Sequence, residues 1–215
     1  MMKRTIAIIF TMALIGSTTV FADETFDRVV EIDTEINSLI SERDGLIASK
    51  TDTVTPLANY ETKYADGQYK VGPDGIPAGE YVFFATGKYG GSFKETTDSN
   101  GTDKIDSEYY DYNMIYTLTE GNYVEITNSI AVPFEEVTEL ITNKGNGAFK
   151  VGVHIPAGEY RLINSTTTGG SCKIWSSSYF GNRDDRINSD YFSTATYITV
   201  HDGEYLVIDN ALFIE

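Results

Sequence analysis

Acidic side chains that recur in two halves of the chain are the first candidates for chemistry. Glu80 and Glu108 in the first half match Glu159 and Asp190 in the second. A glycoside hydrolase needs two carboxyl groups about 5–10 Å apart on either side of the bond that it cleaves. The alternative for Glu80 is a structural role. It directly follows a Pro-Ala-Gly turn, so its side chain either caps that turn or points to solvent. A glycan-active hydrolase with paired carboxylates therefore stays an alternative function.

The two histidines and the single cysteine do not form a pattern for nucleophilic catalysis. His154 replaces a loop residue, and His201 lies in a turn where the first half has Thr119. A catalytic triad requires a histidine beside its nucleophile, and an enzyme in each half would repeat it. Cys172 aligns with Phe93, which indicates a core position, and one Cys with two distant His gives no zinc site. We name no catalytic residue and expect no cofactor unless it is calcium.

The loop at residues 98–103 resembles a calcium-binding loop in composition. Asp98, Asn100 and Asp103 offer oxygen ligands, but the ligand offsets of an EF-hand are not met. The matching loop of the second half places Arg183 in its middle. The sequence therefore leaves two interpretations, a calcium site in the first half alone or a flexible acidic loop.

Aromatic side chains give the best indication of a binding site. Tyrosine is abundant, with 15 residues against a single tryptophan. Exposed tyrosines provide rigid, amphipathic contact surface that stacks on sugar rings or anchors a protein. The alternative is that tyrosine simply suits half-buried strands. The candidate ligand-binding residues lie in or beside the longest loop of each half and are Tyr109, Tyr110, Tyr112, Trp175, Tyr191 and Phe192.

Most of the chain repeats one segment. Residues 69–72 and 76–81 return as 149–152 and 155–160, and from Asp103 onward matching positions are 82 residues apart. A period well above about 50 residues indicates duplicated domains rather than a solenoid. Strands are expected in the first copy at 69–72, 81–86, 92–95, 114–118 and 123–127, with the last two forming a hairpin. The sequence predicts an all-β fold with two tandem small β-sandwich or barrel-like modules, at 67–132 and 149–215.

The turn that opens each copy has a distinctive sequence. The runs V-G-x-x-x-I-P-A-G-E-Y at residues 71–81 and V-G-x-x-I-P-A-G-E-Y at 151–160 resemble a V-G-x-D-I-P-A-G-E-Y repeat of exported Gram-positive bacterial proteins. The resemblance covers residues 69–131 and 149–214 and implies no particular activity. This chain departs at the aspartate, because the first copy has Pro-Asp-Gly at 73–75 and the second has Val-His at 153–154.

The N-terminus has the pattern of a secretory signal peptide. Lys3 and Arg4 precede an apolar run that is too short to span a bilayer, and small residues lead to Ala22. Cleavage after Ala22 would take the formal charge from −16 to −18, because residues 1–22 carry two basic side chains and no acidic ones. So acidic a protein disfavours nucleic acid and anionic lipid as partners. We expect a secreted protein, extracellular or associated with the cell surface, without stable membrane insertion.

An amphipathic helix is predicted at residues 23–50, before a linker at 51–66. Val29, Ile32, Ile36, Leu39 and Leu46 fall on alternating steps of three and four residues, with Arg43 at the remaining seam position, which is the a and d spacing of a coiled coil. Residues 25–47 are therefore either an oligomerising stalk for a homo-oligomer or a helix packed on its own domain. A second, short helix is expected in the connection 133–148, over residues 133–144.

These observations favour a secreted, non-catalytic binding or surface-interaction protein. A cell-wall glycan and a protein are both open as its ligand. A glycan-active hydrolase and a structural secreted protein without a specific ligand are the alternatives.

Overall fold

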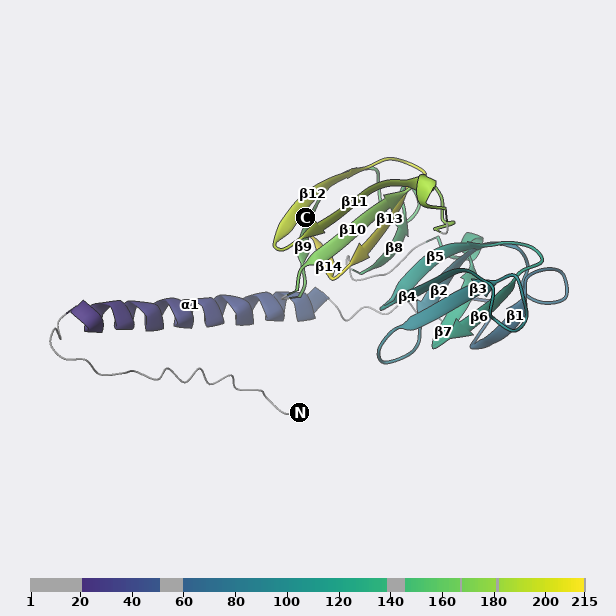
Figure 1. Cartoon of the computed structure of the whole chain (residues 1–215). Coiled ribbons are helices and arrows are strands. Elements are labelled where there is room, and N and C mark those ends of the chain that lie inside the picture. The colour runs from purple at the N-terminus through teal and green to yellow at the C-terminus, as the bar shows by residue number, and fades with distance from the viewer. Residues whose placement is uncertain (1–20, 51–59, 139–145, 167, 181, 215) are drawn as a thin grey trace. The chain divides into compact units, whose positions relative to one another are not determined.

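The computed structural model describes residues 21–50, 60–138, 146–166, 168–180 and 182–214 (Figure 1). The chain divides into two units at residue 46, and each is described by itself. The signal peptide expected at 1–22 and the linker expected at 51–66 lie mostly outside the described residues. Residues 60–66 are not a linker, because Tyr64 pairs with Ala131 through two backbone hydrogen bonds of 2.9 and 2.8 Å. Tyr60 also stacks on Phe84 with ring centroids 5.8 Å apart.

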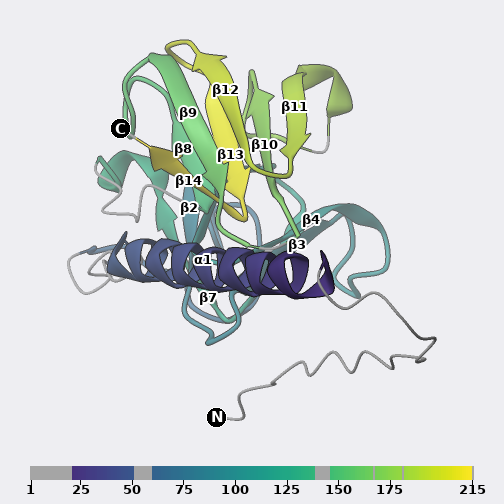
Figure 2. The same ribbon diagram turned by 90° about the vertical axis from the view of Figure 1, so that its left-hand side faces the viewer.

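The N-terminal unit is one long helix, α1, at Phe21–Lys50. Side chains at residues 28–42 are exposed, including the apolar Val29, Ile32, Ile36 and Leu39. The helix expected at 23–50 is present, and the regular elements in the rest of the described chain are strands and two 3-10 turns (Figure 2).

The first module contains seven strands in two antiparallel sheets. Its four-stranded sheet has the order β1-β6-β3-β4 and its three-stranded sheet the order β5-β2-β7. The strand bounds are β1 Gly67–Lys70, β2 Gly79–Ala85, β3 Gly91–Thr96, β4 Lys104–Tyr110, β5 Asn113–Leu118, β6 Tyr123–Thr127 and β7 Ser129–Pro133.

The second module has the same strand order. Its four-stranded sheet reads β8-β13-β10-β11 and its three-stranded sheet β12-β9-β14. The strand bounds are β8 Gly147–Lys150, β9 Gly158–Asn164, β10 Gly170–Trp175, β11 Arg186–Phe192, β12 Ala195–Val200, β13 Tyr205–Asp209 and β14 Ala211–Ile214. The expected all-β fold with an N-terminal helix is confirmed, and each module is a pair of packed sheets.

The expected hairpin at residues 114–127 is wrong. β5 pairs with β2, whereas β6 pairs with β1 and β3, so the turn at 119–122 carries the chain from one sheet to the other. Buried Glu95 on β3 holds this turn, because its carboxylate accepts hydrogen bonds from the Thr119 N–H and the Asn122 amide, both at 2.9 Å. A local turn signal does not distinguish a hairpin from such a crossing.

Two strands and one helix also differ from expectation. β4 and β7 were not expected as strands, and β4 occupies part of the segment assigned to the longest loop. The helix expected at 133–144 is a single 3-10 turn at Phe134–Glu136, because residue 133 completes β7 and Val137 is already non-helical. Residues 139–144 lie outside the described part of the chain.

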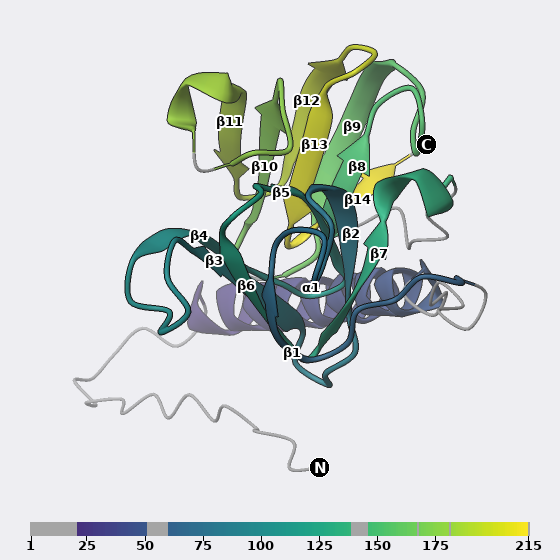
Figure 3. The ribbon, with the colours of Figure 1, turned by 90° about the vertical axis from the view of Figure 1, so that its right-hand side faces the viewer.

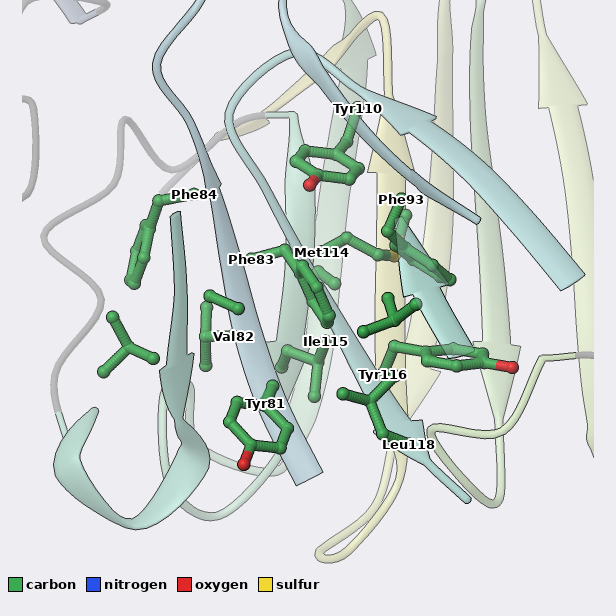
Figure 4. Packing of buried hydrophobic residues seen from close by; sticks show 14 of the residues in the cluster. Tyr81, Val82, Phe83, Phe84, Phe93, Tyr110, Met114, Ile115, Tyr116 and Leu118 are labelled. Carbon is green, nitrogen blue, oxygen red and sulfur yellow. The ribbon is translucent and has the colours of Figure 1, made fainter. Parts of the chain in front are cut away.

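Aromatic rings fill the space between the two sheets of the first module (Figure 4). Phe93 on β3 stacks against Phe83 on β2 at 4.9 Å and contacts Tyr116 on β5 at 4.4 Å. Because successive strand residues point to opposite faces, Val82 and Ile115 lie on the outer face of the three-stranded sheet. Both are fully buried, so something must cover that outer face.

The second module provides the cover. The apolar cluster of the first module continues into Ala148, Trp175, Phe180 and Tyr205, which belong to the second. β5 and β8 lie side by side, and the Asn113 amide donates a 2.7 Å hydrogen bond to the Ala148 carbonyl. The outer face of β5-β2-β7 therefore packs on the outer face of β8-β13-β10-β11, and the β unit is a stack of four sheets (Figure 3).

We predict that Glu95→Ala lowers the free energy of unfolding by about 3 kcal/mol. The change leaves the buried Tyr116 hydroxyl and two less buried donors, at Thr119 and Asn122, without their acceptor, and an orphaned buried group costs about 1–3 kcal/mol. Urea unfolding of the variant measures the loss. Glu125→Ala, on an exposed site of the same sheet, is the control and should change stability by less than about 0.5 kcal/mol. Equal stability of both variants would show that Glu95 does not hold the turn.

Candidate functional site

The outer face of the four-stranded sheet of the first module is open and polar. It carries alternate residues of β3, β4 and β6, and the strand register fixes which of them are neighbours. Ser92 lies opposite Tyr109 and Thr127, and Lys94 lies opposite Ser107 and Glu125. These six residues line an open depression of about 430 Å³. We call this surface the Tyr109 face.

Tyr109 is the most prominent side chain of this face, with 62% of its surface exposed. Its hydroxyl end lies over Gly90, since a Cβ atom at residue 90 would come within 2.8 Å of the Tyr109 Oη. Gly90 also has a φ of +100°, a conformation that favours glycine. The glycine therefore gives the ring room to lie against the end of the sheet.

Charges on the Tyr109 face are paired within it. The Lys94 ammonium lies 2.7 Å from the Glu125 carboxylate, and both side chains remain partly exposed. The hydroxyls of Ser92, Ser107 and Thr127 surround this pair. The face therefore combines an aromatic ring with several hydrogen-bonding groups and little net charge.

The second module repeats four of these six residues in the same register. Ser171 lies opposite Tyr191, and Lys173 lies opposite Ser189, as their counterparts do in the first module. Gly169, with a φ of +104°, lies under the Tyr191 hydroxyl as Gly90 lies under that of Tyr109. Tyr191 is 68% exposed. The remaining two positions differ, with Val207 and Asp209 in place of Glu125 and Thr127.

The setting of this second face is different, because it meets the first module. Ser171 and Lys173 line a cavity of about 130 Å³ together with Glu108, Asp111 and Asp209, among other residues of both modules. Ser189 and Tyr191 on β11 and Asp209 on β13 are exposed, whereas Ser171 and Lys173 are partly buried. The open depression of about 430 Å³ lies on the Tyr109 face, which is therefore the candidate site.

Two carboxyl groups at the cavity between the modules have raised pKa values. Burial raises the pKa of Glu108, which Asp106 raises further and Lys173 and Lys104 lower in part. Burial likewise raises the pKa of Asp209, with Asp111 raising it further and Lys173 opposing. The side-chain oxygen of Asn113 is also buried here without a hydrogen-bond partner among the described residues. The cavity thus disfavours the ionised form of both acids.

Of the six aromatic residues predicted to bind a ligand, three are exposed and three are buried. Tyr109, Tyr112 and Tyr191 are exposed, whereas Tyr110, Phe192 and Trp175 retain only 4–6% of their surface. Neighbouring residues of β4 and β11 point to opposite faces, so one aromatic residue of each adjacent pair enters the core. The prediction is therefore wrong for Tyr110, Phe192 and Trp175.

Sequence comparison of the two halves is enough to find most of the Tyr109 face. Ser92, Lys94 and Ser107 recur as Ser171, Lys173 and Ser189, but recurrence alone does not assign them a role. Glu125 and Thr127 were missed because they do not recur. Apolar and polar residues alternate at 123–127. This alternation, together with the pairing of β6 with β3, is the signal that places Glu125 and Thr127 on the same face as Ser92 and Lys94.

The acidic loop at residues 98–103 is held by its own hydrogen bonds. The Asp98 carboxylate accepts from the Thr102 N–H at 2.9 Å and hydroxyl at 2.5 Å and from the Asp103 N–H at 3.2 Å. These bonds lower the pKa of Asp98. The Asp103 carboxylate accepts from the Thr97 hydroxyl, and Asn100 is exposed. Within the described ranges no three acidic, histidine or cysteine side chains converge on a metal position, so calcium stays a prediction.

The recurring carboxylates occupy separate structural positions. Glu80 lies between the modules, where it accepts hydrogen bonds from the Ser178 hydroxyl at 2.6 Å and the Tyr205 hydroxyl at 2.5 Å. Its counterpart Glu159 is exposed on β9. Asp190 accepts a 2.7 Å hydrogen bond from Thr196. These contacts give Glu80 and Asp190 structural roles.

The histidines and the cysteine also have structural surroundings. His154 receives the Lys150 N–H at Nδ1 and contacts the Val137 carbonyl through Nε2, and burial lowers its pKa. His201 is exposed beside Glu204. Cys172 is buried in the core of the second module, where burial raises its pKa to about 11.

Comparisons with known proteins give no family. No family model matches the chain, and no curated protein matches it in sequence. Among the described residues, no helix is both long enough and apolar enough to cross a membrane.

We predict that Glu108→Gln stabilises the β unit at pH 7 but not near pH 4. A carboxyl whose pKa is raised by folding opposes the folded state once it ionises, and this penalty disappears below its unfolded pKa of about 4.3. Urea midpoints measured from pH 4 to pH 7 should therefore diverge between the variant and the parent as the pH rises. Glu120→Gln, in an exposed turn, is the control. A Glu108→Gln midpoint that runs parallel to the parent at every pH contradicts the prediction.

Proposed function

We propose that the protein is a secreted, non-catalytic binding protein that recognises a neutral glycan through the Tyr109 face. The observation that carries the proposal is an exposed tyrosine ring beside a cluster of hydroxyl, ammonium and carboxylate groups on an otherwise uncovered sheet. A sugar ring presents apolar C–H groups on one face and hydroxyl groups around its edge. A tyrosine ring complements the first, and hydrogen-bonding side chains complement the second.

The charge of the protein favours a neutral glycan over an anionic one. The chain has a formal charge of −16, and such a field repels polyanions. On the Tyr109 face itself, Lys94 is neutralised by Glu125 at 2.7 Å. No free cationic group on this face therefore recruits a carboxylate or phosphate.

The Tyr109 face also suits a glycan better than a protein partner. Stable protein interfaces have an apolar, well-packed centre of aromatic and aliphatic side chains. Here a single tyrosine is surrounded by Ser92, Ser107, Thr127 and a charge pair, which provide hydrogen bonds and little apolar area. A protein ligand is the second possibility from the sequence, and the binding experiment below tests it.

A glycan hydrolase has less support from the arrangement of carboxylates. Glu80 already accepts two hydrogen bonds inside the contact between the modules. Glu108 lines both the cavity of about 130 Å³ and the depression of about 430 Å³, but its recurring partner Glu80 lies in the contact between the modules and lines neither. We therefore assign binding without turnover to this protein.

Export supports the same function, since an extracellular or surface-associated protein meets cell-wall glycans directly. The basic residues and short apolar run before Ala22 support signal-peptide cleavage.

We predict that Tyr109→Ala weakens glycan binding about tenfold. Loss of the stacked ring removes roughly 1.4 kcal/mol, which corresponds to a factor of ten in the dissociation constant. The measurement is a neutral-glycan array with the mature protein, followed by titration calorimetry on the best ligand. Tyr197→Ala is the matched control, because Tyr197 is 65% exposed but lies on β12 of the second module.

Each outcome of this experiment decides between the candidate functions. Weaker binding by Tyr109→Ala alone supports the proposal. Equal binding by both variants places the glycan elsewhere and contradicts it. If no neutral glycan on the array is bound, glycan recognition is excluded and a protein ligand or a structural role remains. Release of reducing ends from a glycan would show that the protein is a hydrolase.

Export gives a separate prediction. Expression of the full chain in a Gram-positive secretion host should release a mature protein whose first residue is Asp23. N-terminal sequencing of the culture supernatant identifies that residue. Retention of Met1 on cell-associated protein would contradict export by signal cleavage.

A further inference from the structure

Helix α1 carries exposed apolar side chains. Val29, Ile32, Ile36 and Leu39 have 41–57% of their surface exposed. A helix in water draws most of its stability from the packing of its apolar face, rather than from helix propensity. A single helix of 30 residues cannot cover this face itself, so the face needs a packing partner.

The spacing of these side chains identifies the geometry of the missing partner. Val29 and Ile36 occupy a positions, and Ile32 and Leu39 occupy d positions, of one heptad frame. A repeat of 3.5 residues keeps such a seam in contact with another helix that winds around it. Packing on a sheet has no such requirement.

The charged residues that flank the seam favour a second copy in parallel orientation. In this frame Arg28 occupies a g position, and Asp33 occupies the e position five residues later. Between two parallel helices in register, Arg28 of one helix lies beside Asp33 of the other. The next g position, Glu35, meets the uncharged Ile40. An antiparallel pair centred on residue 35 would place Arg28 opposite Glu42, which is favourable, but would also place Glu35 opposite Glu35. Parallel pairing brings opposite charges together without a like-charge contact.

A membrane surface fits the same helix poorly. Residues 28–42 contain one basic and four acidic side chains. Helices that lie on membranes have a polar face rich in Lys and Arg, which attracts anionic lipid. The polar face of α1 has the opposite charge.

We propose that α1 is the oligomerisation element of this protein and forms a parallel coiled coil with one or more further copies of the chain. This proposal does not depend on glycan recognition. Where both hold, several Tyr109 faces are joined in one particle, and weak binding at each face adds up through multivalency.

The experiment that tests the proposal is multi-angle light scattering on the mature protein and two variants. Ile36→Glu places a charge on the seam. Val30→Glu is the matched control, because Val30 has nearly the same exposure, 49% against 47%, but lies off the seam. Glutamate is a better helix former than valine or isoleucine, so a change in mass does not reflect poorer helix propensity.

We expect a mass of at least twice that of one chain for the parent and for Val30→Glu, and the mass of one chain for Ile36→Glu. Near-ultraviolet circular dichroism should show the β unit unchanged in all three. A parent that is monomeric at 50–100 µM overturns the proposal, as does a loss of assembly that is equal in both variants. Monomeric parent protein that binds neutral lipid vesicles would identify a membrane as the partner instead.

Orientation is tested with Leu39→Cys in the full mature chain. A d-position cysteine forms a disulfide with its own counterpart only when the helices are parallel and in register. Cys172 does not compete, because it is buried. Covalent dimer on mild oxidation supports the parallel arrangement, and its absence in an assembled protein contradicts it.

Discussion

The contact between the two modules decides which surfaces of the β unit are available to a ligand. It joins the outer face of β5-β2-β7 to the outer face of β8-β13-β10-β11, and it buries Val82, Ile115, Trp175 and Tyr205. In an isolated sandwich these faces would be solvent-exposed. Burial of apolar side chains contributes about 25 cal/mol for each Å² removed from water, so these residues hold the stack together. The contact takes in part of the Tyr191-bearing face, and the open depression lies on the Tyr109 face.

Residue differences between equivalent strand positions follow from this stacking. Val82 and Ile115 on the covered sheet correspond to Arg161 and Tyr197 on the uncovered sheet of the second module, and both of the latter are exposed. Apolar residues thus occur where a sheet meets its neighbour, and polar residues occur where it meets water.

Glu80 shows how the polar part of the contact is satisfied. Its carboxylate receives the hydroxyls of Ser178 and Tyr205 and lies 3.8 Å from the Lys150 ammonium. A buried carboxylate without such donors would be strongly destabilising. The same residue type at position 159 is exposed, because none of the described elements packs against it. Recurrence of Glu80 and Glu159 therefore does not imply a shared catalytic role.

Much of this architecture could be predicted from the sequence, and the parts that could not depend on long-range contacts. Local alternation and turn residues predicted strands close to β2, β3, β5 and β6 and the helix α1. They did not predict that the turn at 119–122 crosses between sheets, because buried Glu95, 24 residues earlier, holds it. Nor could they separate exposed Tyr109 from buried Tyr110, since that choice depends on which side of β4 faces Phe93.

The same limit applies to Trp175. A lone tryptophan in a loop-rich segment is a reasonable candidate for ligand stacking. In the structure it packs against Phe180 with ring centroids 5.0 Å apart, in the cluster shared by both modules. Trp175 belongs to the contact between the modules because the sheets stack. No local sequence pattern predicts that stacking.

Trp175 also provides the most direct measurement of that contact, because it is the only tryptophan of the chain. Urea unfolding followed by Trp175 fluorescence and by far-ultraviolet circular dichroism reports on the contact and on the strands separately. If the stack is one cooperative body, the tryptophan emission begins at the short wavelength of a buried ring and both signals change at the same urea concentration. A red shift of Trp175 at lower urea, with the strand signal intact, would show that the modules separate freely and would contradict the account.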